Sequence, residues 1–227
     1  MADVKPFACC RPRPDLAAEV AALPYDVFNR HEAGAEVDRH PLSFLRIDKT
    51  AALFPDSVSE YDAQVYARAA ELFGDDKAEG VYVAEEDPCY FLYRLTKDGH
   101  AQVGVVACIA VDDYSSGVLK RHENTRHFKL EDRIRHIEVL SAQTGPVLVT
   151  YRAQAKIDAA VSRSVANTTP LYDFVSPDGV SHTVWRVDDP QVTEDIRAGF
   201  EALDALYIAD GHHRAAAACT IGSQKPG

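Results

Sequence analysis

The chain has 227 residues, and its 24 Lys and Arg against 35 Asp and Glu give a formal net charge of −11 at pH 7. With 46% hydrophobic and 26% charged residues, this composition is typical of a globular protein and excludes disordered, collagen-like and disulfide-scaffold classes. The acidic excess argues against a broad nucleic-acid surface, which needs a basic face.

Three further features indicate a protein of the cytoplasm. No apolar run reaches the ~18 residues that a membrane span needs. The first fifteen residues contain no apolar segment of the kind found in secretory signals. The five cysteines form an odd set without CxxC spacing, which fits a reducing compartment better than a disulfide framework. We therefore expect a cytoplasmic protein without membrane or nucleic-acid partners.

The first third of the chain reads as short helices and one strand. Pro24 ends a first helix, Pro41 ends a second, and Gly74 directly follows a third. The predicted elements are helices at 15–23, 32–39 and 61–73 and a strand at 43–47.

The middle third is rich in predicted strands. Strands are expected at 81–83, 90–95 and 102–111, and the Asp-Gly pair within 97–100 predicts a hairpin between the last two. A helix follows at 130–142. Its inner stripe is assigned to Leu130, Ile134 and Ile137, and Asp132, Arg133 and His136 are interpreted as ordinary surface charges.

The last third alternates between the two kinds of element. Strands are predicted at 147–151, 171–175, 181–187 and 206–209, and helices at 157–165, at 195–203 and directly after Asp210. This alternation indicates an α+β (mixed α/β) fold. A slight change of composition near 112–120 divides the chain into an N-terminal α/β region, 1–115, and a second region, 116–227.

The segment Asp210-Gly211-His212-His213-Arg214 carries the clearest chemical signal. A short apolar strand leads into a glycine turn and a new helix, whose first N–H groups and positive dipole end suit an anion such as phosphate. Arg214 adds a fork of donors for phosphate oxygens, the histidines add donors, and Asp210 can hold Mg²⁺. Helix capping by Asp210 with two surface histidines is an equally open interpretation, and metal ligation by the histidine pair is a weaker one.

The polar stretch 120–126 is the second candidate. Glu123 lies among Arg121, His122 and Arg126, and these neighbours would keep its carboxylate ionised, as a general base requires. A solvated loop with exposed ion pairs is the simpler alternative. The sequence contains no P-loop and no dinucleotide-binding glycine motif.

Several of these motifs together resemble a bacterial and archaeal family called domain of unknown function 1015. The resemblance is carried by 207–214 and 120–125, and by the shorter motifs Pro-Tyr-Asp-Val at 24–27, Pro-Leu-Ser-Phe-Leu at 41–45 and Gly-Pro-Val at 145–147. It covers nearly the whole chain.

The Asp-Gly-His-His-Arg element is in turn similar to the phosphate-binding motif of the ParB/sulfiredoxin-like fold. That fold includes kinases that transfer a phosphoryl group from ATP or ADP to free L-serine. The resemblance implies that residues 116–227 form such a region. It implies His122 and Glu123 as the catalytic dipeptide, Gly211 to Arg214 as phosphate ligands, and Asp210 as the Mg²⁺ ligand.

Two relatives and one departure refine this expectation. Sulfiredoxin needs a cysteine where this chain has His212, and the net charge of −11 with no helix-turn-helix signal fits a ParB protein poorly. Members of the resembled family continue further, whereas this chain stops thirteen positions after Arg214. The resemblance therefore implies a fragment with an incomplete second half.

The leading hypothesis is a nucleotide-dependent small-molecule kinase that converts free L-serine to O-phosphoserine. One alternative is a nucleotide-binding regulatory module without catalysis. Another is a metal-dependent hydrolase that uses His122, Asp210, His212 and His213. The acceptor, the choice between ATP and ADP, and the oligomeric state are left open.

Overall fold

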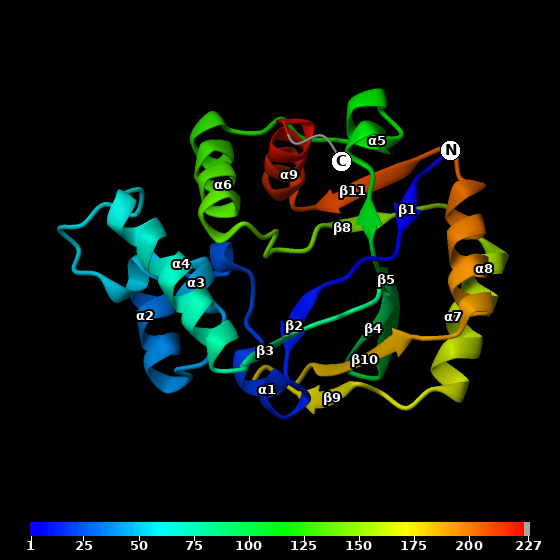
Figure 1. Ribbon diagram of the computed structural model, residues 1–227, viewed down its shortest axis with the longest axis horizontal. Coiled ribbons are helices and arrows are strands. Elements are labelled where there is room, and N and C mark those ends of the chain that lie inside the picture. Colours follow the sequence, from blue (N-terminus) through cyan, green and yellow to red (C-terminus); the bar gives the residue numbers. More distant parts are fainter. Residues whose placement is uncertain (225–227) are drawn as a thin grey trace. The chain divides into compact units, whose positions relative to one another are not determined.

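The computed structural model describes residues 1–224, which form two compact units with a mixed α/β fold (Figure 1). Unit 1 combines residues 1–14, 84–122 and 149–209. Unit 2 combines residues 15–83 and 123–148 with the chain from Asp210 onward. The expected fold class is confirmed.

Unit 1 contains a four-stranded antiparallel sheet in the order β5-β4-β10-β9. Its strands are β4 (Tyr90–Lys97), β5 (His100–Val106), β9 (Tyr172–Val175) and β10 (Ser181–Val187). The hairpin between β4 and β5 turns at Asp98 and Gly99, which have φ angles of 51° and 77°. Two left-handed residues in a two-residue turn are what an Asp-Gly pair favours, so the predicted hairpin is confirmed.

A smaller sheet of unit 1 has β11 at its centre, with β7 and β8 on either side. Within β11, Leu206 and Ile208 are buried and Tyr207 between them is exposed, which is the alternation of a half-buried strand. The remaining short elements of this unit are β1, β2, β6 and the helix α5. The bounds are β1 (Val4–Lys5), β2 (Cys10–Pro12), β6 (Cys108–Ile109), α5 (Val111–Ser116), β7 (Leu119–Lys120), β8 (Leu148–Thr150) and β11 (Leu206–Asp210).

Two helices pack side by side in unit 1, α7 (Ala155–Asn167) and α8 (Pro190–Glu201) (Figure 1). The carboxylate of Asp189 caps α8 by accepting hydrogen bonds from the first backbone N–H groups, and a proline occupies the first turn. Ile196 of α8 is fully buried. Trp185 of β10 is also buried.

Unit 2 is mainly helical. Its longest helix, α4, begins at the cap residue Asp62 and runs for 16 residues. The helices and short elements of this unit are α1 (Ala17–Val20), α2 (Arg30–Arg39), α3 (Leu45–Asp48), α4 (Ala63–Ala78), α6 (His127–Leu140) and α9 (His212–Gln224), with 3-10 turns at Tyr25–Val27 and Thr50–Leu53. A further 3-10 turn (Pro14–Leu16) and the strand β3 (Tyr82–Ala84) lie where the chain enters and leaves the first stretch of this unit.

The core of unit 2 gathers apolar side chains from α3, α4, α6 and the segment before β3. Phe73 and Tyr82 meet edge to face there, with ring centroids 5.6 Å apart. The buried members are Val20, Ile47, Ala69, Leu72, Phe73, Val81, Tyr82 and Leu140. Helices α6 and α9 also lie side by side in this unit (Figure 1).

Three predicted elements are wrong. The expected strand 43–47 is the helix α3, because Leu45 and Ile47 enter two different buried clusters of unit 2 and do not share a sheet face. Gly74 does not end its helix, which continues to Ala78. The expected strand 102–111 is interrupted after Val106 and gives way to α5 at Val111.

The two compact units do not follow the order of the sequence, since each takes stretches from both sides of residue 115. The predicted division into regions 1–115 and 116–227 rests on composition along the chain, and the contacts between residues do not test it.

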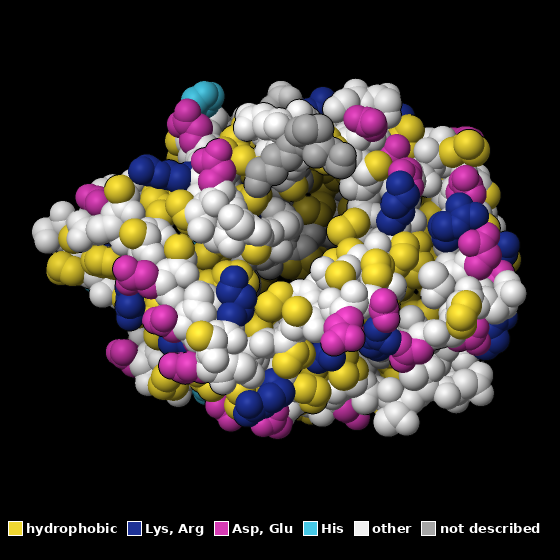
Figure 2. All heavy atoms as spheres, viewed as in Figure 1, with side chains coloured by type: hydrophobic (Ala, Val, Ile, Leu, Met, Phe, Trp, Pro, Cys, Tyr) yellow, Lys and Arg dark blue, Asp and Glu magenta, His cyan; other side chains and the backbone are white. Residues whose placement is uncertain are grey.

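The surface and the cysteines agree with the composition. Acidic and basic side chains are interspersed over the visible face (Figure 2). None of the five cysteines, all within residues 1–224, forms a disulfide. Within residues 1–224, no helix is both long and apolar enough to cross a lipid bilayer.

Candidate functional site

The turn at Gly211 joins the end of β11 to the start of α9. Gly211 has a φ of 89°, a left-handed conformation that glycine adopts without steric cost. Its carbonyl accepts the first hydrogen bond of the helix, from the N–H of Ala215 at 2.9 Å. The backbone N–H groups of His212, His213 and Arg214 therefore lie in the first turn of α9, where a helix has no carbonyl partners for them. The predicted turn and helix are confirmed.

The side chain of Arg214 folds back over this turn and is largely buried, with 12% of its surface exposed. Its Nη2 donates to Asp210 Oδ2, and its Nη1 donates to the carbonyl of Pro146. Two glycines make room for it. A Cβ at Gly145 would lie 2.7 Å from Arg214 Cδ, and one at Gly211 would lie 3.1 Å from the guanidinium. The guanidinium is thus held in a fixed position beside the helix start.

Asp210 presents an exposed carboxylate, 66% accessible, at the entrance to this turn. Among the residues that the structure describes, its hydrogen-bond donor is Arg214 and not a backbone N–H of α9. The capping role that the sequence left open is therefore not the one that Asp210 adopts. Its Oδ1 is left for another ligand, and a single carboxylate of this kind suits Mg²⁺ held jointly with nucleotide phosphates.

The two histidines face different parts of one loop. His212 is buried, and its Nδ1 lies 3.7 Å from Glu123 Oε2. His213 Nε2 accepts a hydrogen bond of 3.0 Å from the backbone N–H of Arg126. Residues 123–126 and the start of α9 thus lie together in unit 2, although 87 residues separate Arg126 from His213.

His213 is held in its neutral form. Its pKa is lowered, first by burial and then by the charge of Lys129. Because Nε2 accepts the Arg126 N–H, the proton of the neutral ring lies on Nδ1. This histidine therefore positions the loop and does not supply a positive charge to the turn.

Residues 120–122 of the polar stretch 120–126 belong to unit 1. Arg121 belongs to unit 1, where its guanidinium lies 4.8 Å from the ring centroid of Tyr114. His122 is the exposed last residue of the same stretch of unit 1, and the next residue, Glu123, begins the following stretch of unit 2. Within unit 2, the structure brings Glu123 together with the segment 210–214.

A buried charged cluster on α6 was missed by the sequence analysis. Arg133 and His136 are 8% and 4% exposed, so their interpretation as surface charges is wrong. Arg133 Nη1 lies 3.1 Å from Asp48 Oδ1, and its Nη2 lies 2.8 Å from Asp132 Oδ2. His136 Nε2 lies 3.3 Å from Asp48 Oδ1. The spacing 133, 136, 140 continues to the buried Leu140, and this helical stripe was the signal available in the sequence.

Aromatic rings complete this cluster. The hydroxyl of Tyr66 donates to Asp132 Oδ1 at 2.6 Å, and the Arg133 guanidinium lies 4.0 Å from the ring centroid of Tyr25. The pKa of Tyr66 is raised by burial and by its hydrogen bond to Asp132. The phenol therefore stays protonated and continues to donate.

The charged groups of the cluster stabilise one another in their ionised forms. Burial by itself would raise the pKa of Asp48, but His136 and the charge of Arg133 outweigh it and hold that pKa below its usual value. Burial likewise opposes the charge of Arg133, yet Asp132 and Asp48 raise its pKa. Asp48 and Arg133 are therefore both ionised at neutral pH.

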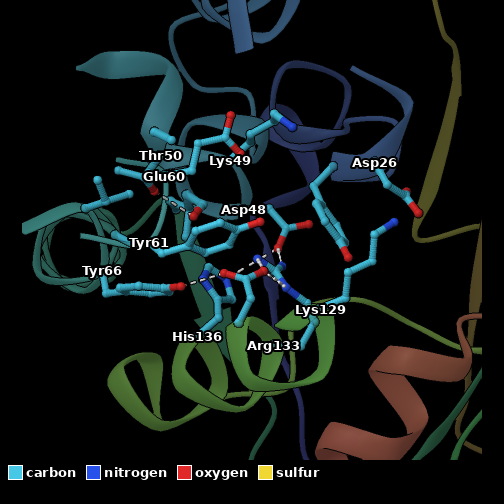
Figure 3. Close-up of a pocket in the computed structure, with 16 residues that line it drawn as sticks. Asp26, Asp48, Lys49, Thr50, Glu60, Tyr61, Tyr66, Lys129, Arg133 and His136 are labelled. Carbon is cyan, nitrogen blue, oxygen red and sulfur yellow. Dashed lines mark hydrogen bonds and ion pairs between the residues drawn. The ribbon is translucent and has the colours of Figure 1, made fainter. Parts of the chain in front are cut away.

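This cluster forms one wall of a cavity of about 220 Å³ between α3, α4 and α6. Figure 3 shows Asp48, Arg133 and His136 gathered together, with Tyr61 and Tyr66 beside them and Lys129 to one side. Charged side chains from five further positions also line it: Asp26, Lys49, Glu60, Lys129 and Asp132. The cavity is a candidate ligand site of unit 2.

Comparison with known proteins identifies the family. The family model described as "Protein of unknown function (DUF1015)" matches residues 4–226. The chain is a member of the DUF1015 family. No curated protein and no solved structure matches it.

In this DUF1015 member, the cavity and the turn adjoin. A smaller hollow of about 10 Å³ is lined by Asp48, Arg133 and His136 on one side and by Thr144, Gly145 and Arg214 on the other. The Thr144 hydroxyl also donates to Asp48 Oδ1 at 3.4 Å. The buried cluster is therefore the partition between the cavity and the arginine of the turn.

Protein side chains alone do not form a metal site in the described part of the chain. Within residues 1–224 of this DUF1015 member, no group of three or more His, Cys, Asp or Glu side chains is arranged to hold a metal ion.

Proposed function

We propose that this protein is a nucleotide-dependent phosphotransferase that transfers a phosphoryl group from ATP or ADP to the hydroxyl of a small molecule, in the first place free L-serine. The observation that carries the proposal is the position of the Glu123 carboxylate, 3.7 Å from His212 Nδ1 at the first turn of α9. An acidic group that can activate an acceptor thus lies beside a helix start that can hold phosphate.

The terminal phosphates of the nucleotide would bind to the N–H groups of the first turn of α9. Those groups and the positive end of the helix dipole favour an anion, and the nearby Arg214 guanidinium adds charge. Asp210 would hold Mg²⁺ through its exposed carboxylate. When bound, the ion neutralises charge that develops on the phosphoryl oxygens.

Glu123 would act on the acceptor. The hydroxyl oxygen forms a bond to phosphorus while the bond to the leaving phosphate oxygen of the nucleotide breaks, and Glu123 takes the hydroxyl proton. His212 orients this carboxylate, and His213 fixes the loop that carries it through the Arg126 N–H. Phosphoryl transfer needs mainly positioning of the reactants and stabilisation of charge, and groups of these types can supply both.

The test is to incubate the full chain with L-serine, Mg²⁺ and either ATP or ADP, and to follow O-phosphoserine by ³¹P NMR. General bases typically contribute ~10²–10⁴-fold, so we expect Glu123→Gln to reduce turnover by at least ~100-fold. Glu131→Gln is the matched control, because Glu131 lies on α6 with 66% of its side chain exposed against 61% for Glu123.

Four results would contradict the proposal. The absence of O-phosphoserine with both nucleotides would exclude the serine kinase, and undiminished turnover in Glu123→Gln would exclude the base. Nucleotide binding without turnover would favour the regulatory module, and stoichiometric zinc in the purified protein would favour the hydrolase.

A further inference from the structure

The wall of the cavity formed by α6 and α3 carries a carboxylate oxygen that the fold leaves available. Asp48 Oδ1 is contacted by Arg133 Nη1 at 3.1 Å, by His136 Nε2 at 3.3 Å and by the Thr144 hydroxyl at 3.4 Å. Within residues 1–224, Asp48 Oδ2 accepts no hydrogen bond, and the side chain is only 13% exposed. A poorly solvated carboxylate oxygen of this kind favours a ligand that brings a cation.

The cavity also presents cations that lack partners. Lys49 and Lys129 are half-buried, and within residues 1–224 neither has an ion pair or a side-chain hydrogen bond. The two other charged residues of the wall, Asp26 and Glu60, are exposed. The less exposed part of the wall therefore offers ammonium groups to an anion, at a different place from the carboxylates of the cluster.

The volume of the cavity limits the size of the ligand that it can bind. Its volume of about 220 Å³ lies below the ~300–1,000 Å³ of pockets that enclose drug-sized molecules. Buried apolar side chains of Ile47, Val65 and Ala69 line the remainder. A whole nucleotide is too large for this space, whereas a molecule of a few heavy atoms fits.

The cavity also lies next to the turn of α9. Arg133, Asp48 and His136 separate it from Arg214, and the charge of Lys129, which lines the cavity, acts on His213 of the turn. A small molecule bound in the cavity would thus be a neighbour of a phosphate bound at the turn.

We propose that this cavity binds a small zwitterion, an α-amino acid, with its ammonium group toward Asp48 and its carboxylate toward Lys129. The ligand class follows from the charges and size of the cavity. Its role as the acceptor site for phosphoryl transfer rests on the proposed function.

The test measures binding to the full chain by calorimetry without nucleotide. The probes are L-serine, its methyl ester, which lacks the carboxylate charge, and 3-hydroxypropanoate, which lacks the ammonium group. A hydrogen bond to a charged group contributes enough that we expect each altered probe to bind at least about tenfold more weakly than L-serine.

Lys129→Met is the decisive variant, since Lys129 has no partner in the fold to lose. We expect it to weaken L-serine binding about tenfold and to remove the preference for L-serine over the ester. Lys97→Met, in the β4–β5 hairpin of unit 1, is the matched control and leaves both quantities unchanged. Unchanged far-ultraviolet circular dichroism and urea midpoints verify that both variants are folded.

The outcomes separate the two proposals. If O-phosphoserine forms but Lys129→Met alters neither the KM for L-serine nor the preference over the ester, the cavity assignment is wrong and the phosphotransferase stands. If L-serine binds with the stated losses but no phosphoryl transfer occurs, the cavity assignment stands and the proposed function is wrong. Failure of L-serine to bind, or equal binding of all three probes, overturns the cavity assignment.

Discussion

At the level of single residues, Arg133 is a buried charged group with several partners in unit 2. Its guanidinium contacts Asp48, Asp132 and the ring of Tyr25, and only 9% of its side chain is exposed. Its removal would leave two carboxylates in a poorly solvated place, and such unpaired buried charges are strongly destabilising.

We therefore predict that Arg133→Met lowers the free energy of unfolding by about 3–5 kcal/mol, as measured by urea denaturation at pH 7. Arg68→Met on α4 is the control, because Arg68 pairs with Glu71 on the surface and exposed pairs contribute about 0–1 kcal/mol. Equal effects of the two substitutions would show that the buried cluster does not contribute to stability.

His213 gives unit 2 a pH dependence of defined sign. The pKa of His213 is lowered in the folded chain, by burial first and by Lys129, His212 and Arg126 beyond that, whereas Glu123 opposes the shift. The unfolded chain then binds more protons than the folded chain below about pH 6.5, so stability rises with pH in that range. The contribution is complete above the unfolded value and is lost as pH falls through the folded one.

We expect the ring of His213 to titrate below its usual value of about 6.5 in ¹⁵N NMR spectra, with Nε2 unprotonated at neutral pH. We also expect His213→Gln to flatten the fall of the urea midpoint between about pH 6.5 and pH 5. A midpoint above 6.5, or a proton on Nε2 at neutral pH, would contradict the hydrogen bond from Arg126.

The site shows which single residues a sequence can reveal. The strand, glycine turn and helix around 210–214 could be predicted because these elements adjoin along the chain, whereas the contact of His212 with Glu123 joins two segments far apart in the sequence. Arg133 was misassigned because charged side chains are mostly exposed. The spacing 133, 136, 140 indicated its buried side, but its pairing with Asp48, 85 residues away, could not be predicted from local sequence.

At the level of elements, short apolar runs were the main source of error. Strand β10 was predicted with its observed bounds and β9 to within one residue, since Pro177, Asp178 and Gly179 mark the turn between two β-rich runs. The run 43–47 has the same apolar character but forms α3. Runs of this length do not distinguish a strand from a buried helical turn, and here the packing of Leu45 and Ile47 decides.

Helix α4 offers a stabilising substitution at the glycine that was expected to end it. Gly74 lies in the helix interior, and a Cβ there would meet no atom within 4 Å. Because glycine is about 0.8–1.0 kcal/mol less favourable than alanine inside a helix, we predict that Gly74→Ala stabilises the protein by about 1 kcal/mol in urea denaturation.

Gly145→Ala is the contrasting variant, since its Cβ would lie 2.7 Å from Arg214 Cδ. We expect it to destabilise the protein and to displace the guanidinium from the turn. If Gly74→Ala also destabilised the chain, α4 would not continue through this position as a regular helix.

At the level of the whole molecule, the chain alternates between its two units, and each unit takes three separate stretches. Composition along the sequence cannot reveal such an arrangement, because neighbouring stretches of different units have similar residues. The core of unit 2 illustrates this, as Leu140 of α6 packs with Val20 and with residues of α4. Contacts of this range are fixed by the tertiary structure and not by local pattern.

The alternation of the chain between its two units predicts which residues lose protection from hydrogen exchange when one core is disrupted. Ala217 of α9 is fully buried in unit 2, and Ile196 of α8 is fully buried in unit 1. An aspartate at either position places an unpaired charge in an apolar core. We expect Ala217→Asp to increase amide hydrogen exchange together in residues 15–83, 123–148 and 210–224, and Ile196→Asp to do so in residues 1–14, 84–122 and 149–209. Each variant is the control for the other. Increased exchange confined to the mutated helix, or the same pattern for both variants, would show that the units are not separate cooperative bodies.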